Sequence, residues 1–401
     1  MLASGLATAD PIAGLFGHRQ IPPGRITFAF RVLTVQTWRE TPATLPRHSV
    51  FDDMRPSILI TGAAGFIGFH LAQRLLQGGV TVLGVDNLNN YYDPALKRAR
   101  VNLLRQSPQF QFHQIDLADR QAARRLFAEE AFGPVIHLAA QAGVRHSLID
   151  PHAYVDANIT GFANVLEGCR QRRTPHLIFA SSSSVYGANT RQPSSTRDNA
   201  DHPVSLYAAT KKANEQMAHS YSHLFRIPAT GLRFFTAYGT WYRPDMGMFI
   251  FARAILRGEP IRLFNRGDMR RDFTYVDDVV DAVVALIDRP AQPNISWSGV
   301  SPDPASSSAP WRIYNVGSGR PTATTRIVDL LEQELGRKAI RELAPLQPGD
   351  VIETCADIDD LAREIGIRPR TSIEDGIKIF AAWFRDYHEA AKLQQSSAAT
   401  A

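Results

Sequence analysis

Three stretches of the 401-residue chain carry residues whose types and spacing suit chemistry on a bound ligand: proton transfer, hydrogen bonding and phosphate binding. Residues 207–211 read YAATK, and Tyr207 and Lys211, four residues apart, share one face of any helix that contains them. A tyrosine takes up a hydroxyl proton near neutral pH only if its pKa falls from about 10 toward 7. A lysine ammonium beside it, together with the positive ring of an oxidised nicotinamide, would lower that pKa. A tyrosine beside a lysine is also a common surface pair, so YAATK alone leaves both interpretations open.

The second stretch is a row of four hydroxyls, Ser181 to Ser184, which follows the apolar run HLIFA. Serine is poor strand material and ordinary in turns. The row is therefore either an unremarkable turn or a set of hydrogen-bond donors directed at a ligand.

The third stretch is GAAGFIG, which places Gly62, Gly65 and Gly68 between a short apolar run and a segment of helical period. Such a turn brings the backbone close to a pyrophosphate, which then lies at the N-terminus of the helix. The next apolar run, 80–86, ends in Asp86, at the distance expected for an acid that accepts a ribose 2′-hydroxyl. Because a carboxylate there repels a 2′-phosphate, the pattern favours NAD over NADP.

The elements that must position these residues alternate between strand and helix. Strands are predicted over 57–61, 80–86, 110–116, 135–140, 176–182 and 229–235, with helical segments over 121–131, 158–172 and 206–224 between them. This alternation predicts an α/β fold with a doubly wound parallel (Rossmann-like) sheet, which binds ligands at the carboxyl ends of its strands. After Phe235 the pattern loosens into a smaller mixed α/β C-terminal lobe, which we expect to bind the substrate.

The predicted domain organisation has four parts. Residues 1–53 are proline-rich and read as a disordered extension or a misassigned start, with Met54 as the initiator. Residues 54–235 form the NAD-binding domain, to which 270–290 and part of 310–330 return, and 236–392 form mainly the substrate lobe. Residues 393–401 are expected to be a disordered tail. The Pro/Ser-rich segment 289–310 is expected to be a loop of the small lobe.

Composition narrows the classes of function. The net charge of +5 is scattered, so no clustered basic face suggests nucleic-acid binding. No apolar run is long enough to cross a bilayer. The two cysteines, Cys169 and Cys355, fit a reducing compartment and hence the cytoplasm. The histidines show no metal-ligand spacing, so no metal is predicted, and His137 reads as core packing.

From about Pro56 to about Tyr387 the sequence resembles the extended short-chain dehydrogenase/reductase family, specifically its nucleotide-sugar epimerases. Within this family it is most similar to UDP-glucuronate 4-epimerases. The stretches that carry the resemblance are ITGAAGFIGFHLAQRLL, VDNLNNYYDPALKRAR, HLAAQAGVRHSL, SSSSVYG, YAATKKANE, GLRFFTAYGTWYRPDMGMF, GDMRRDFTYVDDVV and QPGDV. Asn90, Thr240 and Tyr242 depart from the residues usual in the family, which bears on fine substrate preference rather than on the chemistry.

The resemblance implies a catalytic group of Ser182, Tyr207 and Lys211 and a tightly held NAD. Tyr207 would accept the O4 proton of the sugar through or alongside Ser182, while Ser181 would be a structural strand-end hydroxyl. The implied NAD-binding residues are Gly62, Gly65, Phe66, Ile67, Gly68, Asp86, Asn87, Asp116, Leu117, Leu138, Ala139, Ala140, Gln141, Asn158, Tyr207, Lys211 and Phe234.

Ser183 and Ser184 stand where related dehydratases carry Asp-Glu and related decarboxylases carry glutamate. With hydroxyls only, the chain lacks the carboxylates for elimination but can hold a sugar carboxylate; alternatively the two serines only cap the turn. The remaining implied substrate residues are Arg145, Thr236, Arg243, Met248, Phe264, Arg271 and Asp350. Arg271 would grip the diphosphate, Phe264 would stack on uracil, and Asp350 would accept from the uridine ribose. Arg145 and Arg243 are candidate counter-charges for the carboxylate, or else members of structural ion pairs.

These residues predict an NAD-dependent 4-epimerase that interconverts UDP-glucuronate and UDP-galacturonate. Three alternatives remain open: another UDP-hexose 4-epimerase, a UDP-glucuronate decarboxylase, and an NAD-binding regulatory protein of the same fold. Resemblance also implies a homodimer, paired through the helices over 158–172 and 206–224.

Overall fold

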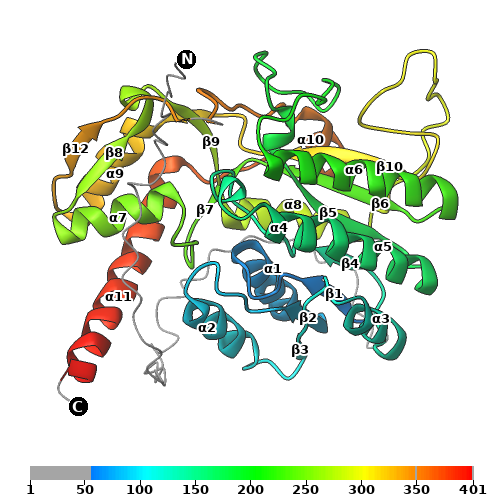
Figure 1. Ribbon diagram of the computed structural model, residues 1–401, viewed down its shortest axis with the longest axis horizontal. Helices are drawn as coiled ribbons and strands as arrows, with labels where there is room; N and C mark the ends of the chain where they lie inside the picture. The colour runs from blue at the N-terminus through cyan, green and yellow to red at the C-terminus, as the bar shows by residue number, and fades with distance from the viewer. Residues whose placement is uncertain (1–55, 348–349, 400–401) are drawn as a thin grey trace, which may run out of the picture. The chain divides into compact units, whose positions relative to one another are not determined.

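A seven-stranded, fully parallel sheet forms the centre of the structure (Figure 1). The computed structural model describes residues 56–347 and 350–399, with side chains through Glu389. The predicted extension, residues 1–53, lies outside these ranges. Strand order is β10-β6-β5-β4-β1-β2-β3, which is the doubly wound order predicted. The strands are β1 (Ile58–Thr61), β2 (Val82–Asp86), β3 (Phe110–Gln114), β4 (Val135–His137), β5 (Leu177–Ser182), β6 (Ala229–Phe234) and β10 (Trp311–Val316).

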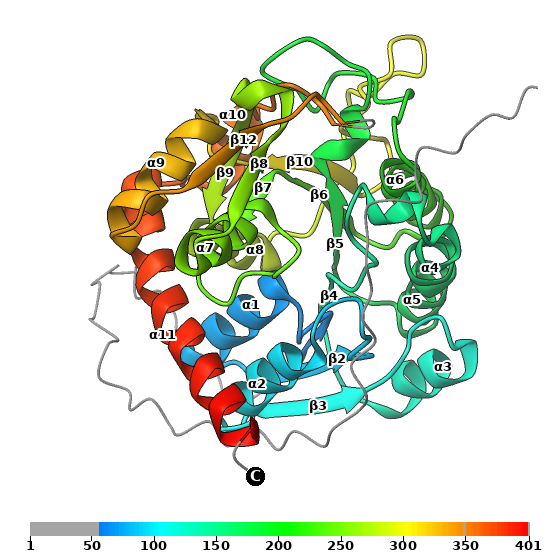
Figure 2. The same ribbon diagram turned by 60° about the vertical axis from the view of Figure 1, so that its left-hand side comes forward.

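Helices cover both faces of this sheet, as Figures 1 and 2 show together. One face carries α1 (Phe66–Gln77), α2 (Pro94–Leu104) and α8 (Val276–Ile287). The other carries α3 (Arg120–Glu129), α4 (Pro151–Tyr154), a π-helical turn (Val155–Thr160), α5 (Gly161–Arg172) and α6 (Leu206–Phe225). Because side chains alternate along a strand, Ile58 and Ile60 of β1 join the core under α1, whereas Leu59 joins the core under α3 and α5.

The smaller lobe, as far as the chain is described, is built from two short sheets and three helices. In one sheet, β7 (Thr236–Tyr238) runs parallel to β9 (Arg270–Tyr275), and β11 (Pro321–Ala323) runs antiparallel to it. The other pairs β8 (Pro260–Leu263) with β12 (Ile340–Leu343). The helices are α7 (Gly247–Arg257), α9 (Thr324–Leu335) and α11 (Ile373–Ala399), whereas α10 (Asp359–Ile365) packs against β10 and α8. Single 3₁₀ turns cover His146–Leu148, Ser183–Tyr186 and Phe264–Gly267.

The course of the chain differs from expectation in two places. The segment 289–310 does not belong to the small lobe: it connects α8 to β10 and is bonded to α6, where His219 Nε2 lies 2.8 Å from Ser307 Oγ and Ser222 Oγ donates to Pro310 O. Helix α11 continues through Ala399, past Leu393, where a disordered tail was expected. Among the described residues, no helix combines the length and apolar character that a bilayer crossing requires.

Candidate active site

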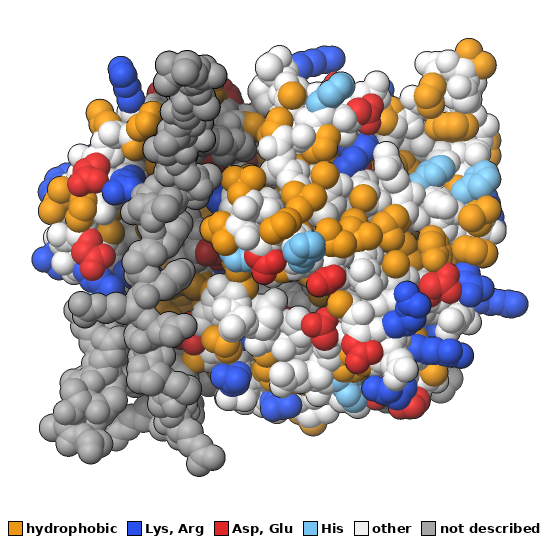
Figure 3. Space-filling model, viewed as in Figure 1, with side chains coloured by type: hydrophobic (Ala, Val, Ile, Leu, Met, Phe, Trp, Pro, Cys, Tyr) orange, Lys and Arg blue, Asp and Glu red, His pale blue; other side chains and the backbone are white. Residues whose placement is uncertain are grey.

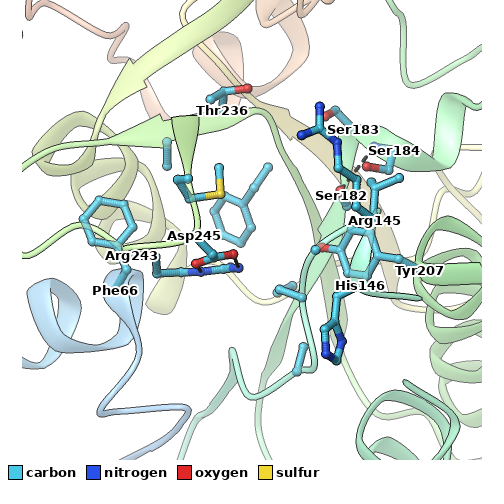
Figure 4. Close-up of a pocket in the computed structure, with 18 of the residues that line it drawn as sticks. Phe66, Arg145, His146, Ser182, Ser183, Ser184, Tyr207, Thr236, Arg243 and Asp245 are labelled. Carbon is cyan, nitrogen blue, oxygen red and sulfur yellow. Dashed lines mark hydrogen bonds and ion pairs between the residues drawn. The ribbon is translucent and has the colours of Figure 1, made fainter. Parts of the chain in front are cut away.

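A cleft of about 970 Å³ opens at the carboxyl ends of the central strands and is closed on its other side by the small lobe. Its walls include every residue predicted for the site except Asn158. Figure 4 shows Ser182, Ser183, Ser184 and Tyr207 on one side of the cleft, across from Phe66, Arg243 and Asp245. The predicted residues, far apart in the sequence, therefore meet in one cavity.

The glycine turn between β1 and α1 lies against this cleft. Gly62 has a φ of +74°, which side chains other than glycine rarely adopt. A Cβ on Gly68 would stand 2.1 Å from the carbonyl oxygen of Gly62, so only glycine lets the helix approach the turn this closely. Because Gly65 caps α1 without a side chain, the first N–H groups of the helix stay accessible to an anion.

Acidic residues follow β2 and β3 on the same rim. Asp86 is buried and accepts from the N–H groups of Ala64 and Leu88 at 3.2 and 2.8 Å, which fixes its carboxylate beside the glycine turn. Asp116 accepts from the Asn87 side chain and from the N–H of Ala118. A turn that only glycine fits, followed by oriented acceptors at the ends of the next strands, matches the needs of a diphosphate and a ribose, and so fits NAD.

Asn158, which was predicted to bind the cofactor, does not line the cleft. It lies in the π-helical turn, 1% exposed, where its side chain accepts from the N–H of Gln141 at 2.8 Å and donates to the Gln141 carbonyl at 3.0 Å. Asn158 therefore braces the backbone of the cleft wall. Gln141 itself lines the cleft and has a buried side-chain nitrogen without a hydrogen-bond partner among the described residues.

Ser182, Tyr207 and Lys211 meet where β5 ends against α6. Ser205 caps α6, accepting from the N–H of Ala208, and thereby fixes where the helix begins relative to Tyr207. Ser182 accepts from the N–H of Ser184 at 3.1 Å and so caps the turn that follows β5. The capping role considered for Ser183 and Ser184 thus belongs to Ser182.

Burial dominates the electrostatics of this group. Burial raises the pKa of Tyr207, while a hydrogen bond with Ser182 and the charge of Arg243 act to lower it. Burial lowers the pKa of Lys211 to about 8, opposed by the charge of Glu215. Within the described residues, burial therefore outweighs the groups that act to lower the pKa of Tyr207.

The wall that would face a sugar C6 is lined by hydroxyls. Ser183, Ser184 and Thr236, the first residue of β7, all line the cleft. In the described part of the chain, the hydroxyls of Ser183 and Ser184 make no hydrogen bond to another residue. They are consequently available to a ligand.

The candidate arginines are engaged in pairs. Arg243 binds Asp245 through two contacts of 3.0 and 2.5 Å, and Asp245 also accepts from the Tyr91 hydroxyl at 3.1 Å. Arg145 binds Asp350 at 2.8 Å. Both arginines are thus ion-paired and also line the cleft, so their role as counter-charges for a sugar carboxylate stays a prediction.

The nucleotide end of the cleft is occupied by these same side chains. The Arg145 guanidinium lies 4.7 Å from the centre of the Phe264 ring, on the face expected to stack on uracil. Arg271 donates to the carbonyls of Arg270 and Ile352, and burial lowers its pKa. Arg271 lines the cleft at the position expected for a diphosphate contact, alongside Met248.

Three residues that line the cleft were not predicted from the sequence: Tyr91, His146 and Asp245. Tyr91 and Asp245 hold Arg243, and His146 packs edge-on against Tyr91 with ring centroids 4.8 Å apart. NNYYD, WYRPDM and GVRHS, which contain them, were recognised as characteristic stretches. The aspartate two residues after Arg243 was the signal that could have revealed the pair.

The fold and cleft together define a nucleotide-dependent enzyme of the doubly wound class. The chain belongs to the NAD dependent epimerase/dehydratase family, which matches residues 58–298. It is 51% identical over 332 residues to Protein CapI of Staphylococcus aureus, covering 83% of this chain and 99% of that one. It is 46% identical over 329 residues to the probable UDP-glucuronate 4-epimerase of Rhizobium meliloti (strain 1021), covering 81% and 96%.

Solved structures agree with these relatives. The UDP-glucuronic acid 4-epimerase of Bacillus cereus, in complex with UDP-glucuronic acid and NAD, is 30% identical, with a TM-score of 0.72 over 82% of this chain and 99% of that one. The predicted family and fold class are thereby confirmed.

Proposed function

We propose that the protein interconverts UDP-glucuronate and UDP-galacturonate by inverting carbon 4 of the sugar. The observation that carries this proposal is the meeting of Ser182, Tyr207 and Lys211 with a glycine turn in one cleft whose sugar wall holds hydroxyls instead of carboxylates. The relatives named as UDP-glucuronate 4-epimerases support the same substrate.

The residues of the chain divide the work. When bound, NAD supplies reversible hydride transfer at C4. Tyr207 accepts the proton of O4 and later returns it, with Ser182 orienting that oxygen and Lys211 holding the nicotinamide ribose. The glycine turn, Asp86 and the Asn158-braced segment at Gln141 keep the cofactor in place.

The sugar wall limits the reaction to epimerisation. A 4-keto uronate is a β-keto acid that loses carbon dioxide readily. Ser183 and Ser184 donate to the carboxylate and hold it, and these two positions carry hydroxyls where elimination would need an acid and a base. The short side chain of Thr236 leaves room for the keto sugar to turn and present its other face.

We further propose that the protein acts as a homodimer in the cytoplasm. Hydrophobic side chains gather over α4, α5 and α6 (Figure 3), and Leu148, Ile149 and Leu224 on this side are 69%, 66% and 65% exposed. A surface of this kind is typical of an interface. Both cysteines are free thiols, in keeping with a reducing compartment. Light scattering on the purified protein measures the subunit number directly.

The test is to incubate the purified protein with each UDP-uronate and separate the products by chromatography. We expect either substrate to yield the other, without net consumption of NAD. UDP-xylose as the main product would establish the decarboxylase instead, and NAD binding without turnover would favour the regulatory protein. Tyr207→Phe should abolish turnover, at least about 100-fold, while retaining NAD; full activity in this variant would exclude Tyr207 as the base.

A further inference from the structure

A buried carboxylate lies directly behind the proposed catalytic group. Glu215 follows Tyr207 and Lys211 on α6 at intervals of four residues, so the three share one face of the helix. Its side chain is 2% exposed and does not line the cleft. Burying a carboxylate is unfavourable unless it is fully partnered, so the contacts of Glu215 indicate its role.

Glu215 joins α6 to the ends of two strands. It accepts from the Ser181 hydroxyl on β5 at 2.6 Å and from two nitrogens of Arg233 on β6 at 2.8 and 2.9 Å. Ser181 and Arg233 are paired residues across these strands. Because Ser182 follows Ser181, the contact fixes the strand end that carries the catalytic hydroxyl against the helix that carries Tyr207.

The charge of Glu215 reaches Lys211 as well. Burial lowers the pKa of Lys211 and so favours its neutral form, whereas the negative charge of Glu215 acts to raise that pKa. The other titratable groups that face Lys211 are Tyr207 on α6 and His137 on β4, and burial lowers the pKa of His137 to about 3, which leaves it neutral. Among the described residues, Glu215 is therefore the anion whose charge favours the Lys211 ammonium, from one helical turn away.

The partners of Glu215 hold the carboxylate in its ionised form. Burial acts to raise its pKa, but Arg233, with Lys212 at 3.6 Å and Ser181, keeps it below the ordinary value. Arg233 is itself completely buried and lies 4.8 Å from the centre of the Tyr186 ring. Arg233 thus lies between Glu215 and Tyr186, which itself lines the cleft.

We propose that Glu215 is a positioning residue for the reaction: through Ser181 it locks Ser182 in register with Tyr207, and from the next turn of α6 it places a negative charge beside Lys211. This inference rests on the proposed function, since it concerns the same three groups. It assigns two separable tasks to one side chain: one depends on its charge and the other on its hydrogen bond to β5.

Two variants separate these tasks. Glu215→Gln alone leaves the buried Arg233 guanidinium without a counter-charge, and we expect it to destabilise the fold strongly. Glu215→Gln combined with Arg233→Met removes both charges while an amide oxygen can still accept from Ser181. Ser181→Ala removes the anchor and keeps the charge. The matched control is Glu332→Gln. Glu332 lies on α9 outside the cleft, its side chain is 4% exposed, and it is paired with Lys338 and Arg341.

The pH profile of kcat distinguishes positioning from general stability. In the wild type, activity should decline as the pH rises through about 8, where Lys211 loses its proton. In the double variant this decline should move about one pH unit lower. Ser181→Ala should lower kcat about tenfold with KM little changed and the profile in place. A double variant whose profile coincides with that of the wild type would overturn the charge role.

A second readout does not depend on the substrate. The free energy of unfolding is measured as a function of pH for four proteins. These are the wild type and the double variant, each with Lys211 and with Lys211→Met. The folded-state pKa of about 8 lies below the ordinary 10.5, so the wild type should gain stability relative to Lys211→Met across this interval. The gain should begin at lower pH in the double variant; an unchanged onset rejects the inference. If neither UDP-uronate is turned over, the proposed function fails while this measurement still decides the role of Glu215.

Discussion

The contacts of Asn158 allow the two roles considered for it to be told apart quantitatively. Replacing Asn158 with alanine removes a side chain that satisfies both the N–H and the carbonyl of Gln141 and also donates to Thr210 Oγ1 at 3.0 Å. Each buried polar group left without a partner costs about 1–3 kcal/mol. With two such groups on Gln141, we expect Asn158→Ala to lower the free energy of unfolding by about 2–6 kcal/mol.

The assay is urea unfolding of NAD-free protein, followed by titration with NAD. A residue that braces the backbone destabilises the NAD-free protein when removed, whereas a residue that only contacts the cofactor weakens NAD binding and leaves that stability unchanged. A loss below about 0.5 kcal/mol in NAD-free Asn158→Ala would refute the bracing role. Asn158→Asp is the companion variant, since it keeps the acceptor for the Gln141 N–H and loses only the donated bonds.

Two further predictions follow from the turn and the sheet. Gly68→Ala should yield protein that no longer retains NAD and melts several degrees lower, because its Cβ would lie 2.1 Å from the Gly62 carbonyl oxygen; Gly299→Ala, whose nearest neighbour would be 3.8 Å away, should behave as wild type in the same thermal scan. His137 has a folded-state pKa of about 3, below its ordinary 6.5, so its contribution to stability is present above pH 6.5 and is lost as the pH falls toward 3. His137→Phe should therefore lose less stability on acidification than the wild type, and an equal or steeper loss in acid-unfolding curves would contradict this.

Local sequence patterns predicted the elements well because those patterns are themselves local. Strand β6 was expected over 229–235 and spans Ala229–Phe234, and α6 was expected over 206–224 and spans Leu206–Phe225. Each is defined by an apolar period and by turn or cap residues within a few positions.

Partners that are distant in the sequence could not be predicted in this way. Arg145 meets Asp350 across 205 positions, and Asn158, which lies in a π-helical turn, meets Gln141 across 17 positions. The segment 289–310 was assigned to the small lobe because it follows that region in the sequence. Its contacts with α6 depend on the strand order, which a local pattern does not contain.

Strand β10 pairs with β6, so the chain passes between the two lobes more than once and the lobes are not joined by a single hinge. A polypeptide that ended after Phe235 would leave one edge of β6 without its partner strand β10, and it would lack α8, which packs against α1. Neither half is therefore a transferable module, and limited proteolysis between the lobes should release no stable fragment. We therefore expect the part of the chain that binds the nucleotide and the part that selects the sugar to fold together.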